Sequence, residues 1–81
     1  MTATFEIVAE ESRRRILDLL VEQERPVGDL VDRLALSQPA VSKHLKVLRD
    51  AGLVESSRRG TWAYYRLVPD AVRELRHTLG G

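Results

Sequence analysis

The stretch "SQPAVSKHLKVLRDAGLV", residues 37–54, decides the fold of this chain. It begins with small polar residues and a proline, which suit the cap and first turn of a helix. Its apolar residues Val41, Leu45 and Leu48 then recur at helical spacing. Gly52 is typical of the residue that ends a helix. The stretch therefore predicts one amphipathic helix whose opposite face is polar and cationic.

The apolar residues before this stretch form two further helical stripes. The first belongs to a helix that Ser12 can cap and that ends before Arg25-Pro26. The second is about two turns long, and only "ALS" (residues 35–37) separates it from the next helix. The stripes comprise Ile16, Leu17, Leu20 and Val21, followed by Val27, Leu30, Val31 and Leu34. Two helices joined by so short a turn predict a helix-turn-helix over about residues 27–51.

After Leu53 the apolar period changes to two, and "LVESSRRGTWAYYRL" predicts a β-hairpin with its turn near Arg59-Gly60. We expect Tyr65 on its inner face to join the core. On the outer face, Trp62 and Tyr64 could support the wing or contact the sugar-phosphate backbone, and packing is favoured for Trp62. Pro69 then begins a last helix over about residues 69–79. The order predicts a mainly α fold with a two-stranded β-wing over about residues 53–67. This is a winged helix-turn-helix, which we expect to form one domain over residues 1–81.

The net charge of +1 hides an uneven distribution. Residues 1–36 carry five basic and eight acidic side chains, whereas residues 37–66 carry six basic and two acidic ones. A basic segment beside an acidic one is typical of a surface that meets a polyanion, although a chance cluster gives the same pattern. The basic run at residues 13–15 follows Glu10 and Glu11, so we expect a solvated, locally paired helix face there.

The outward face of the helix after Ser37 is the candidate for reading DNA bases. Small polar side chains at its start let a helix enter the major groove closely. Glutamine can bond adenine at N6 and N7, lysine can reach guanine O6 and N7, serine suits several base edges, and alanine can contact a thymine methyl. The residues predicted to contact bases are Gln38, Ala40, Ser42 and Lys43.

A second set is predicted to contact phosphates. The start of a helix and the cations beside it suit phosphate oxygens, and arginines at a hairpin tip can reach phosphates or the minor groove. The set comprises Ser37, His44, Lys46 and Arg49 on the helix and Arg58, Arg59 and Thr61 on the wing. His44 lies at the edge of the apolar stripe, so packing with a hydrogen bond, phosphate contact and metal ligation all stay open. A solvated surface is the alternative for the others.

Several function classes are excluded by what the chain lacks. It has no cysteine, no glycine-rich phosphate loop and no nucleophile elbow. Ser37, His44 and Asp50 point in diverging directions from one helix and cannot form a catalytic triad. We expect no enzyme activity, no cofactor and no metal. Nothing resembles a signal peptide or a membrane span, so we expect a cytoplasmic protein.

Together, "SRRRILDLL", "SQPAVSKHLKVLRDAGLV" and "RRGTWAYYRL" resemble the ArsR/SmtB family of bacterial winged-helix repressors, over nearly all of residues 5–79. The resemblance implies a homodimer that binds an imperfect inverted repeat in an operator. It also implies that Gln38, Ser42 and Lys43 occupy base-reading positions. Family dimers pair through their first and last helices, which here assigns Phe5, Val8, Val72, Leu75 and Leu79 to the dimer interface.

The chain departs from the family pattern in several places. The cysteine motif of metal-sensing members is missing, and Glu11 replaces the family's proline. The last helix offers only Asp70, Glu74 and His77 as metal ligands, and it is short for the family. The resemblance therefore implies DNA binding without the usual metal site, and the effector stays unknown.

These observations favour a homodimeric repressor whose partner is double-stranded operator DNA. The rival is a winged helix that serves as a protein-interaction or assembly module without specific DNA binding. A protein-binding face would expose more apolar surface than the basic helix and wing predicted here. RNA binding would favour more aromatic side chains than the four in this chain.

Overall fold

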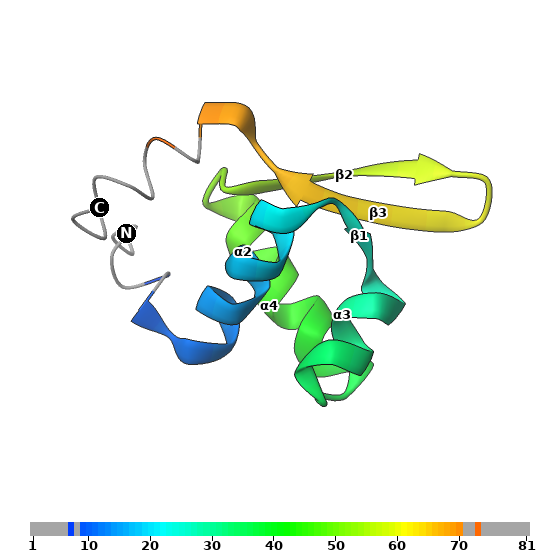
Figure 1. Cartoon of the computed structure of the whole chain (residues 1–81), viewed down its shortest axis with the longest axis horizontal. Helices are drawn as coiled ribbons and strands as arrows, with labels where there is room; N and C mark the ends of the chain where they lie inside the picture. The colour runs from blue at the N-terminus through cyan, green and yellow to red at the C-terminus, as the bar shows by residue number, and fades with distance from the viewer. Residues whose placement is uncertain (1–6, 8, 71–72, 74–81) are drawn as a thin grey trace.

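The computed structural model describes residues 7, 9–70 and 73 of the 81-residue chain. Within this part, three helices form a compact body and a β-hairpin projects beyond it (Figure 1). The elements are α2 (Glu11–Glu22), β1 (Arg25–Pro26), α3 (Val27–Leu34), α4 (Gln38–Asp50), β2 (Val54–Arg59) and β3 (Trp62–Leu67). This arrangement confirms the predicted fold class, a winged helix-turn-helix.

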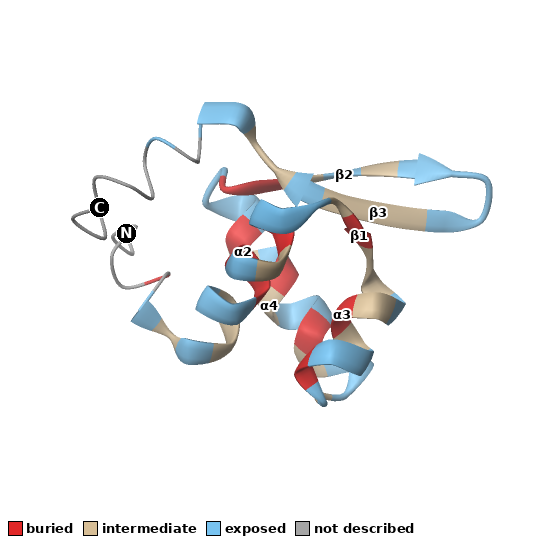
Figure 2. Cartoon of the chain, viewed as in Figure 1, coloured by how far each residue is buried: buried red, intermediate tan, exposed pale blue. Residues whose placement is uncertain are grey.

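The apolar stripes of the three helices meet in one core, which the hairpin closes on one side (Figure 2). The buried cluster comprises Ile7, Ile16, Leu17, Leu20, Leu30, Leu34, Val41, Leu45, Leu48, Leu53 and Val54. Tyr65 packs against this cluster, as predicted. Val21 was predicted to belong to the apolar stripe of this helix. It lies instead in the last turn of α2 with 64% of its surface exposed.

The residue that caps α2 is Glu10, and the prediction of Ser12 was wrong. The backbone N–H of Arg13 donates to Glu10 Oε2 over 2.9 Å, whereas Ser12 lies inside the helix. Partial burial opposes ionisation of Glu10. Hydrogen bonds from the backbone N–H groups of Arg13 and Ser12, together with the nearby His44, outweigh this effect and hold the pKa of Glu10 below its usual value.

The two ends of α4 follow the predicted chemistry. Ser37 is the N-cap, with its Oγ accepting the N–H of Ala40 at 3.2 Å, and Pro39 lies in the first turn. At the other end, Gly52 adopts a φ of 80°. Its N–H donates to the carbonyl of Arg49, and the next residue donates to the carbonyl of Leu48. This pair of hydrogen bonds is a Schellman motif, in which a left-handed residue closes the helix.

The sheet contains one strand that the sequence analysis missed. β1 pairs antiparallel with β3, with Arg25 opposite Tyr65 and Pro26 opposite Tyr64, and the strand order is β1-β3-β2. In the sequence, Arg25-Pro26 indicates only the end of the preceding helix. Neighbouring residues do not reveal the strand, because Pro26 pairs with Tyr64, 38 positions later in the chain. The hairpin itself is as predicted, with its two-residue loop at residues 60–61 and Gly60 at a φ of 64°.

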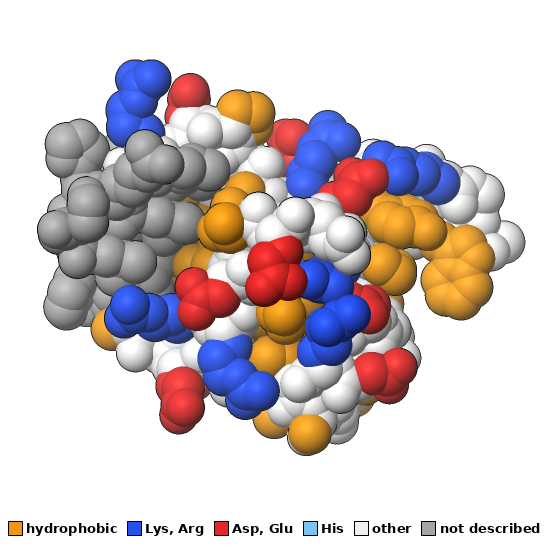
Figure 3. All heavy atoms as spheres, viewed as in Figure 1, with side chains coloured by type: hydrophobic (Ala, Val, Ile, Leu, Met, Phe, Trp, Pro, Cys, Tyr) orange, Lys and Arg blue, Asp and Glu red, His pale blue; other side chains and the backbone are white. Residues whose placement is uncertain are grey.

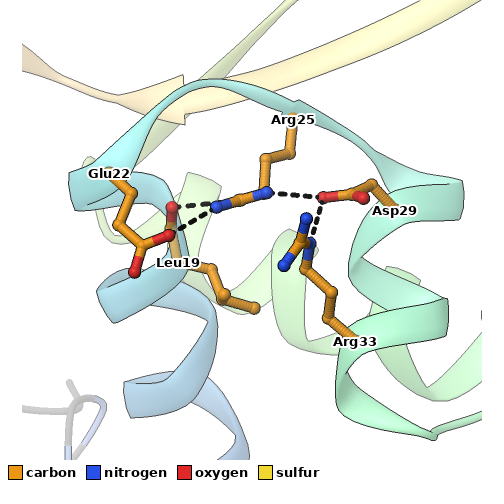
Figure 4. Close-up of polar contacts among 5 residues, drawn as sticks. All are labelled: Leu19, Glu22, Arg25, Asp29 and Arg33. Atoms are coloured by element: carbon orange, nitrogen blue, oxygen red, sulfur yellow. Dashed lines mark hydrogen bonds and ion pairs between the residues drawn. The ribbon is translucent and has the colours of Figure 1, made fainter.

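Arg25, whose polar contacts are drawn in Figure 4, is the one buried charged residue in the described part of the chain. Only 3% of its surface is exposed. Its guanidinium donates to the carbonyl oxygen of Leu19 (3.1 Å), to Glu22 Oε1 (2.7 Å) and to Asp29 Oδ2 (2.8 Å). The hydrogen bond from Arg25, aided by a second from Arg33, holds the pKa of Asp29 below its usual value despite some opposing burial. Arg25 thus joins the end of α2 to the start of α3.

The residues assigned to the dimer interface, Phe5, Val8, Val72, Leu75 and Leu79, lie outside the described residues. The same holds for most of the predicted helix at residues 69–79. Pro69, Asp70 and Arg73 are helical, in agreement with its expected start.

Candidate nucleic-acid interface

The outward face of α4 carries the residues predicted to read bases. Gln38, Ser42 and Lys43 are exposed, and Ala40 is half-buried beside the N-cap. Gln38 and Ser42 are four residues apart, so their side chains lie on one face of the helix. These side chains therefore stand clear of the core while Val41 anchors the same turn within it.

The cations farther along α4 differ in their surroundings. Lys46 Nζ lies 2.8 Å from Asp50 Oδ2, and both side chains are exposed. The hydrogen bond from Lys46 lowers the pKa of Asp50. Lys43 and Arg49 make no ion pair with any residue that the structure describes. Exposed pairs such as Lys46–Asp50 are weak in water, so this lysine can exchange its carboxylate for another anion.

His44 lies where α4 meets the start of α2. Its Nδ1 atom is buried, lies 3.7 Å from Glu10 Oε2 and has no hydrogen-bond partner among the described residues. The side chain retains 20% of its exposure. His44 is thus largely packed, but its buried Nδ1 lacks the hydrogen bond that the first reading included, and contact with phosphate stays a prediction.

The wing carries a cation that is already paired. Arg59 Nη1 lies 2.6 Å from Glu24 Oε1, and the Arg59 guanidinium carbon lies 4.8 Å from the centre of the Tyr64 ring. Arg58 and Thr61 are exposed near the same tip. The sequence analysis did not find Glu24, because the pair joins residues 35 positions apart that only the pairing of β1 with β3 brings together.

Trp62 does not pack as predicted, because 60% of its surface is exposed. It follows the hairpin loop directly and pairs with Arg59, at the end of the sheet that extends beyond the helices (Figure 1). No element of the described part covers this end of the wing. The exposed indole is therefore part of the surface that includes Arg58, Arg59 and Thr61, which we call the wing tip.

The face drawn in Figure 3 shows acidic and basic side chains interspersed over α2 and α3, without a basic patch. Of the basic run at residues 13–15, predicted to be a solvated and locally paired helix face, Arg14 and Arg15 are exposed. Arg13 is half-buried, and its Nε donates to the carbonyl oxygen of Ile7 over 2.8 Å. We take α4 and the wing, which carry the predicted contacts, as the candidate interface.

Neither a metal centre nor a membrane helix occurs in the described part of the chain. No group of three or more histidine and acidic residues is close enough there to hold a metal ion. Of the three ligands that the last helix offers, Asp70 is described and exposed, whereas Glu74 and His77 lie outside the described residues. No helix among residues 9–70 is long and apolar enough to cross a bilayer.

Known proteins are similar in sequence to this chain over most of its length. Residues 10–56 match the model of a family of bacterial regulatory proteins, the arsR family. The chain is 43% identical over 78 residues to an arsenic resistance transcriptional regulator of Pseudomonas putida, a match that covers 95% of this chain and 61% of that protein. It is 46% identical over 66 residues to the arsenical resistance operon repressor of Escherichia coli, which covers 80% of this chain and 56% of the repressor.

A solved structure shares the fold. The solution structure of a homodimeric winged helix-turn-helix DNA-binding domain from Mycobacterium bovis, a possible ArsR-family transcriptional regulator, superposes with a TM-score of 0.81 at 33% identity. The match covers 93% of this chain and 72% of that one. The present chain spans less than two thirds of the length of the Pseudomonas and Escherichia proteins.

Proposed function

The chain belongs to the ArsR family of bacterial regulatory proteins, and on that premise we propose that it is a homodimeric repressor that binds an inverted-repeat operator in duplex DNA. The relatives described above are transcriptional regulators and not enzymes. The observation that carries the proposal is the outward face of α4. It combines a capped helix start, small exposed polar side chains and cations, directly beside a projecting wing.

In this proposal the start of α4 enters the major groove and reads the operator. Gln38 bonds adenine, Lys43 reaches guanine, and Ser42 accepts or donates at neighbouring bases. Ala40 is half-buried and offers only its methyl group, which suits a thymine methyl. Substitution of these residues would change sequence preference more than overall affinity.

The remaining predicted contacts hold the duplex on either side of that groove. Ser37 and the N-terminus of α4 present N–H groups and a positive helix end to one phosphate. Lys46, Arg49 and His44 border the helix, and Arg58, Arg59 and Thr61 approach the flanking backbone from the wing tip. These contacts supply affinity and orientation without sequence information.

A symmetric dimer would place its two copies of α4 in successive major grooves. Their centres would then lie about 34–36 Å apart along the duplex, or a multiple of that distance. Phe5, Val8, Val72, Leu75 and Leu79 are proposed for the interface between the subunits. The homodimeric state of the Mycobacterium domain supports this assembly.

The effector is proposed to be something other than a thiolate-bound metal ion, because the chain contains no cysteine. An organic ligand, or constitutive repression without a ligand, remains consistent with the sequence. The proposed site of action is the cytoplasm, where operator DNA is accessible.

Selection of bound sequences from a random pool of duplex DNA tests this function. The expected result is one enriched motif with two-fold symmetry, which the purified protein then shifts on a gel at moderate salt. Size measurement by light scattering should show a dimer. Failure to enrich any duplex, with a folded protein, would reject DNA binding and favour the protein-interaction module.

A further inference from the structure

The wing-tip residue Arg59 is held by a carboxylate from the other side of the sheet. Glu24 lies between α2 and β1, and its Oε1 atom lies 2.6 Å from Arg59 Nη1. The guanidinium also lies over the Tyr64 ring at 4.8 Å. Because β1 pairs with β3, Glu24 is held beside the hairpin. Arg59 therefore has an anionic partner before DNA binds.

A carboxylate and a DNA phosphate are similar ligands for arginine. Both present two oxygens that the guanidinium can bond with paired N–H groups. Glu24 occupies Arg59 Nη1 and offsets the charge of the guanidinium, so a phosphate gains less from Arg59 while the pair persists. In addition, while Glu24 stays paired with Arg59, its negative charge lies next to the DNA phosphates that the wing approaches and repels them.

The surroundings of this pair allow the exchange. The Arg59 side chain keeps 52% of its exposure and that of Glu24 keeps 32%, so water screens their attraction. The Arg25 network is the contrasting case. Arg25 is 3% exposed and donates to three acceptors, so its contacts serve the fold and are not free to change. Tyr64 meanwhile offers Arg59 a fixed ring surface in either state.

We propose that Glu24 competes with DNA phosphate for Arg59, and that this internal competition sets the affinity and the salt dependence of the wing contact. The inference rests on the proposed DNA binding and adds a residue to it that contacts no DNA. Arg59 exchanges Glu24 for a phosphate when the wing docks, and Glu24 then faces solvent. The wing therefore binds duplex DNA more weakly than the number of its arginines indicates.

The test compares Glu24→Gln with Glu55→Gln. Glu55 is the matched control, because it also pairs with an arginine across the sheet, with its Oε1 atom 2.8 Å from Arg66 Nε. That pair lies toward the other end of the hairpin, away from the loop. Both variants remove one negative charge from the sheet, and Glu24 also attracts the charge of Arg66. The comparison therefore accounts for the general effect of net charge and for an effect through Arg66, and leaves the part that passes through Arg59.

Binding to a duplex carrying the selected motif is measured at several salt concentrations. Glu24→Gln should lower Kd by about threefold to tenfold beyond the effect of Glu55→Gln, a range that corresponds to two released exposed pairs per dimer. The slope of log K against log salt should steepen by less than about 0.9 for each subunit, because the number of phosphate contacts is unchanged and only the ion uptake by the released Glu24 is lost. Glu24→Asp, which keeps the charge on a shorter side chain, should give an intermediate Kd. In an Arg59→Ala background, Glu24→Gln should add no more than Glu55→Gln.

Equal effects of Glu24→Gln and Glu55→Gln, or weaker binding by Glu24→Gln, would overturn the inference while leaving the proposed function intact. Persistence of the Glu24→Gln gain in the Arg59→Ala background would also overturn it, because the gain would not pass through Arg59. Absence of duplex binding by the unmodified chain would instead reject the proposed function, and the inference with it.

Discussion

Oε2 of Glu10 lies 3.7 Å from Nδ1 of His44, so the residue that caps α2 also contacts the helix proposed to read DNA. One carboxylate therefore accepts the N–H group of Arg13, the third residue of α2, and faces the side of α4 that borders the core. This approach brings the start of α2 next to the middle of α4. It makes Glu10 a residue whose loss should affect stability and the seating of α4 together.

Replacing Glu10 by alanine should lower the free energy of unfolding by about 1 kcal/mol, the usual effect of losing a side-chain N-cap. Urea denaturation followed by circular dichroism measures the change. Glu11→Ala is the control, because Glu11 is an exposed neighbour in the first turn and makes no capping hydrogen bond. A loss no larger than that of Glu11→Ala would contradict the capping role.

We also expect the effect of Glu10→Ala on the free energy of unfolding to depend on pH. The pKa of Glu10 is lowered in the folded chain from an ordinary value of 4.5. Its contribution is therefore fully present above the unfolded pKa and is lost as the pH falls through the folded one. The difference in stability between wild type and Glu10→Ala should be constant near neutral pH and shrink in acid. A difference that grows in acid would mean that the protonated group is the stabilising form.

Arg25→Ala should destabilise the fold by about 2–3 kcal/mol, because it removes a buried charge with several charge-assisted hydrogen bonds. The pKa of Asp29 should rise at the same time, since the hydrogen bond from Arg25 is the main cause of its depression. Arg33→Ala is the matched control: its pair with Asp29 is exposed, and the expected loss is below about 1 kcal/mol. Comparable losses for both arginines would show that burial of Arg25 is unimportant.

Gln38→Ala should reduce the discrimination between operator and unrelated duplex by about 1–3 kcal/mol. Arg59→Ala should weaken binding to all duplexes alike, because phosphate contacts carry no sequence information. Affinities of both variants for the selected motif and for a scrambled duplex separate the two effects. If the two variants lower both affinities in the same proportion, the assignment of base reading to Gln38 is wrong.

The salt dependence of binding tests the electrostatic part of the interface. If each subunit makes about three or four cationic phosphate contacts, log K should fall with log salt at a slope of about −5 to −7 for the dimer. Fluorescence anisotropy of a labelled duplex, titrated at several salt concentrations, gives this slope. A slope near zero would exclude the phosphate contacts proposed on α4 and the wing.

Trp62 offers a reporter at the wing tip, because it is the single tryptophan of the chain and is 60% exposed. Its emission should shift and its quenching by acrylamide should decrease when operator DNA binds. A duplex too short to reach the wing is the control and should leave the signal unchanged. Unaltered emission at saturating operator would show that the wing tip stays in solvent.

The local pattern of the sequence predicted most of the fold, because helix stripes, caps and the hairpin depend on neighbouring residues. Leu30, Val41 and Leu48 could be placed in the core from spacing alone. The features that were missed depend on distant pairings. Glu24 meets Arg59 only after β1 has paired with β3, and Trp62 is exposed because the hairpin extends beyond the helices.

The candidate site divides in the same way. Exposure of Gln38, Ser42 and Lys43 follows from helix periodicity and could be predicted before the structure. The pairing of Arg59 could not, because it depends on a distant carboxylate that the fold brings near, whereas Lys46 and Asp50 are four residues apart on one helix. Arg59 and Lys46 are paired in the structure, and nothing in their own neighbourhood of the sequence separates Arg59 from Arg58.

The two-residue strand β1 joins the wing directly to the helix-turn-helix, because it pairs with β3 and runs into α3. Pro26 ends β1 and Val27 begins α3, so no linker separates sheet from helix. A rotation of the hairpin must therefore turn the start of α3, and with it the α4 packed against α3. In a dimer bound to DNA, the depth of α4 in the major groove and the distance of the wing from the DNA backbone would change together. A conformational change that tilts one subunit would then alter the contact of α4 with the groove and the contact of the wing with the DNA backbone at the same time.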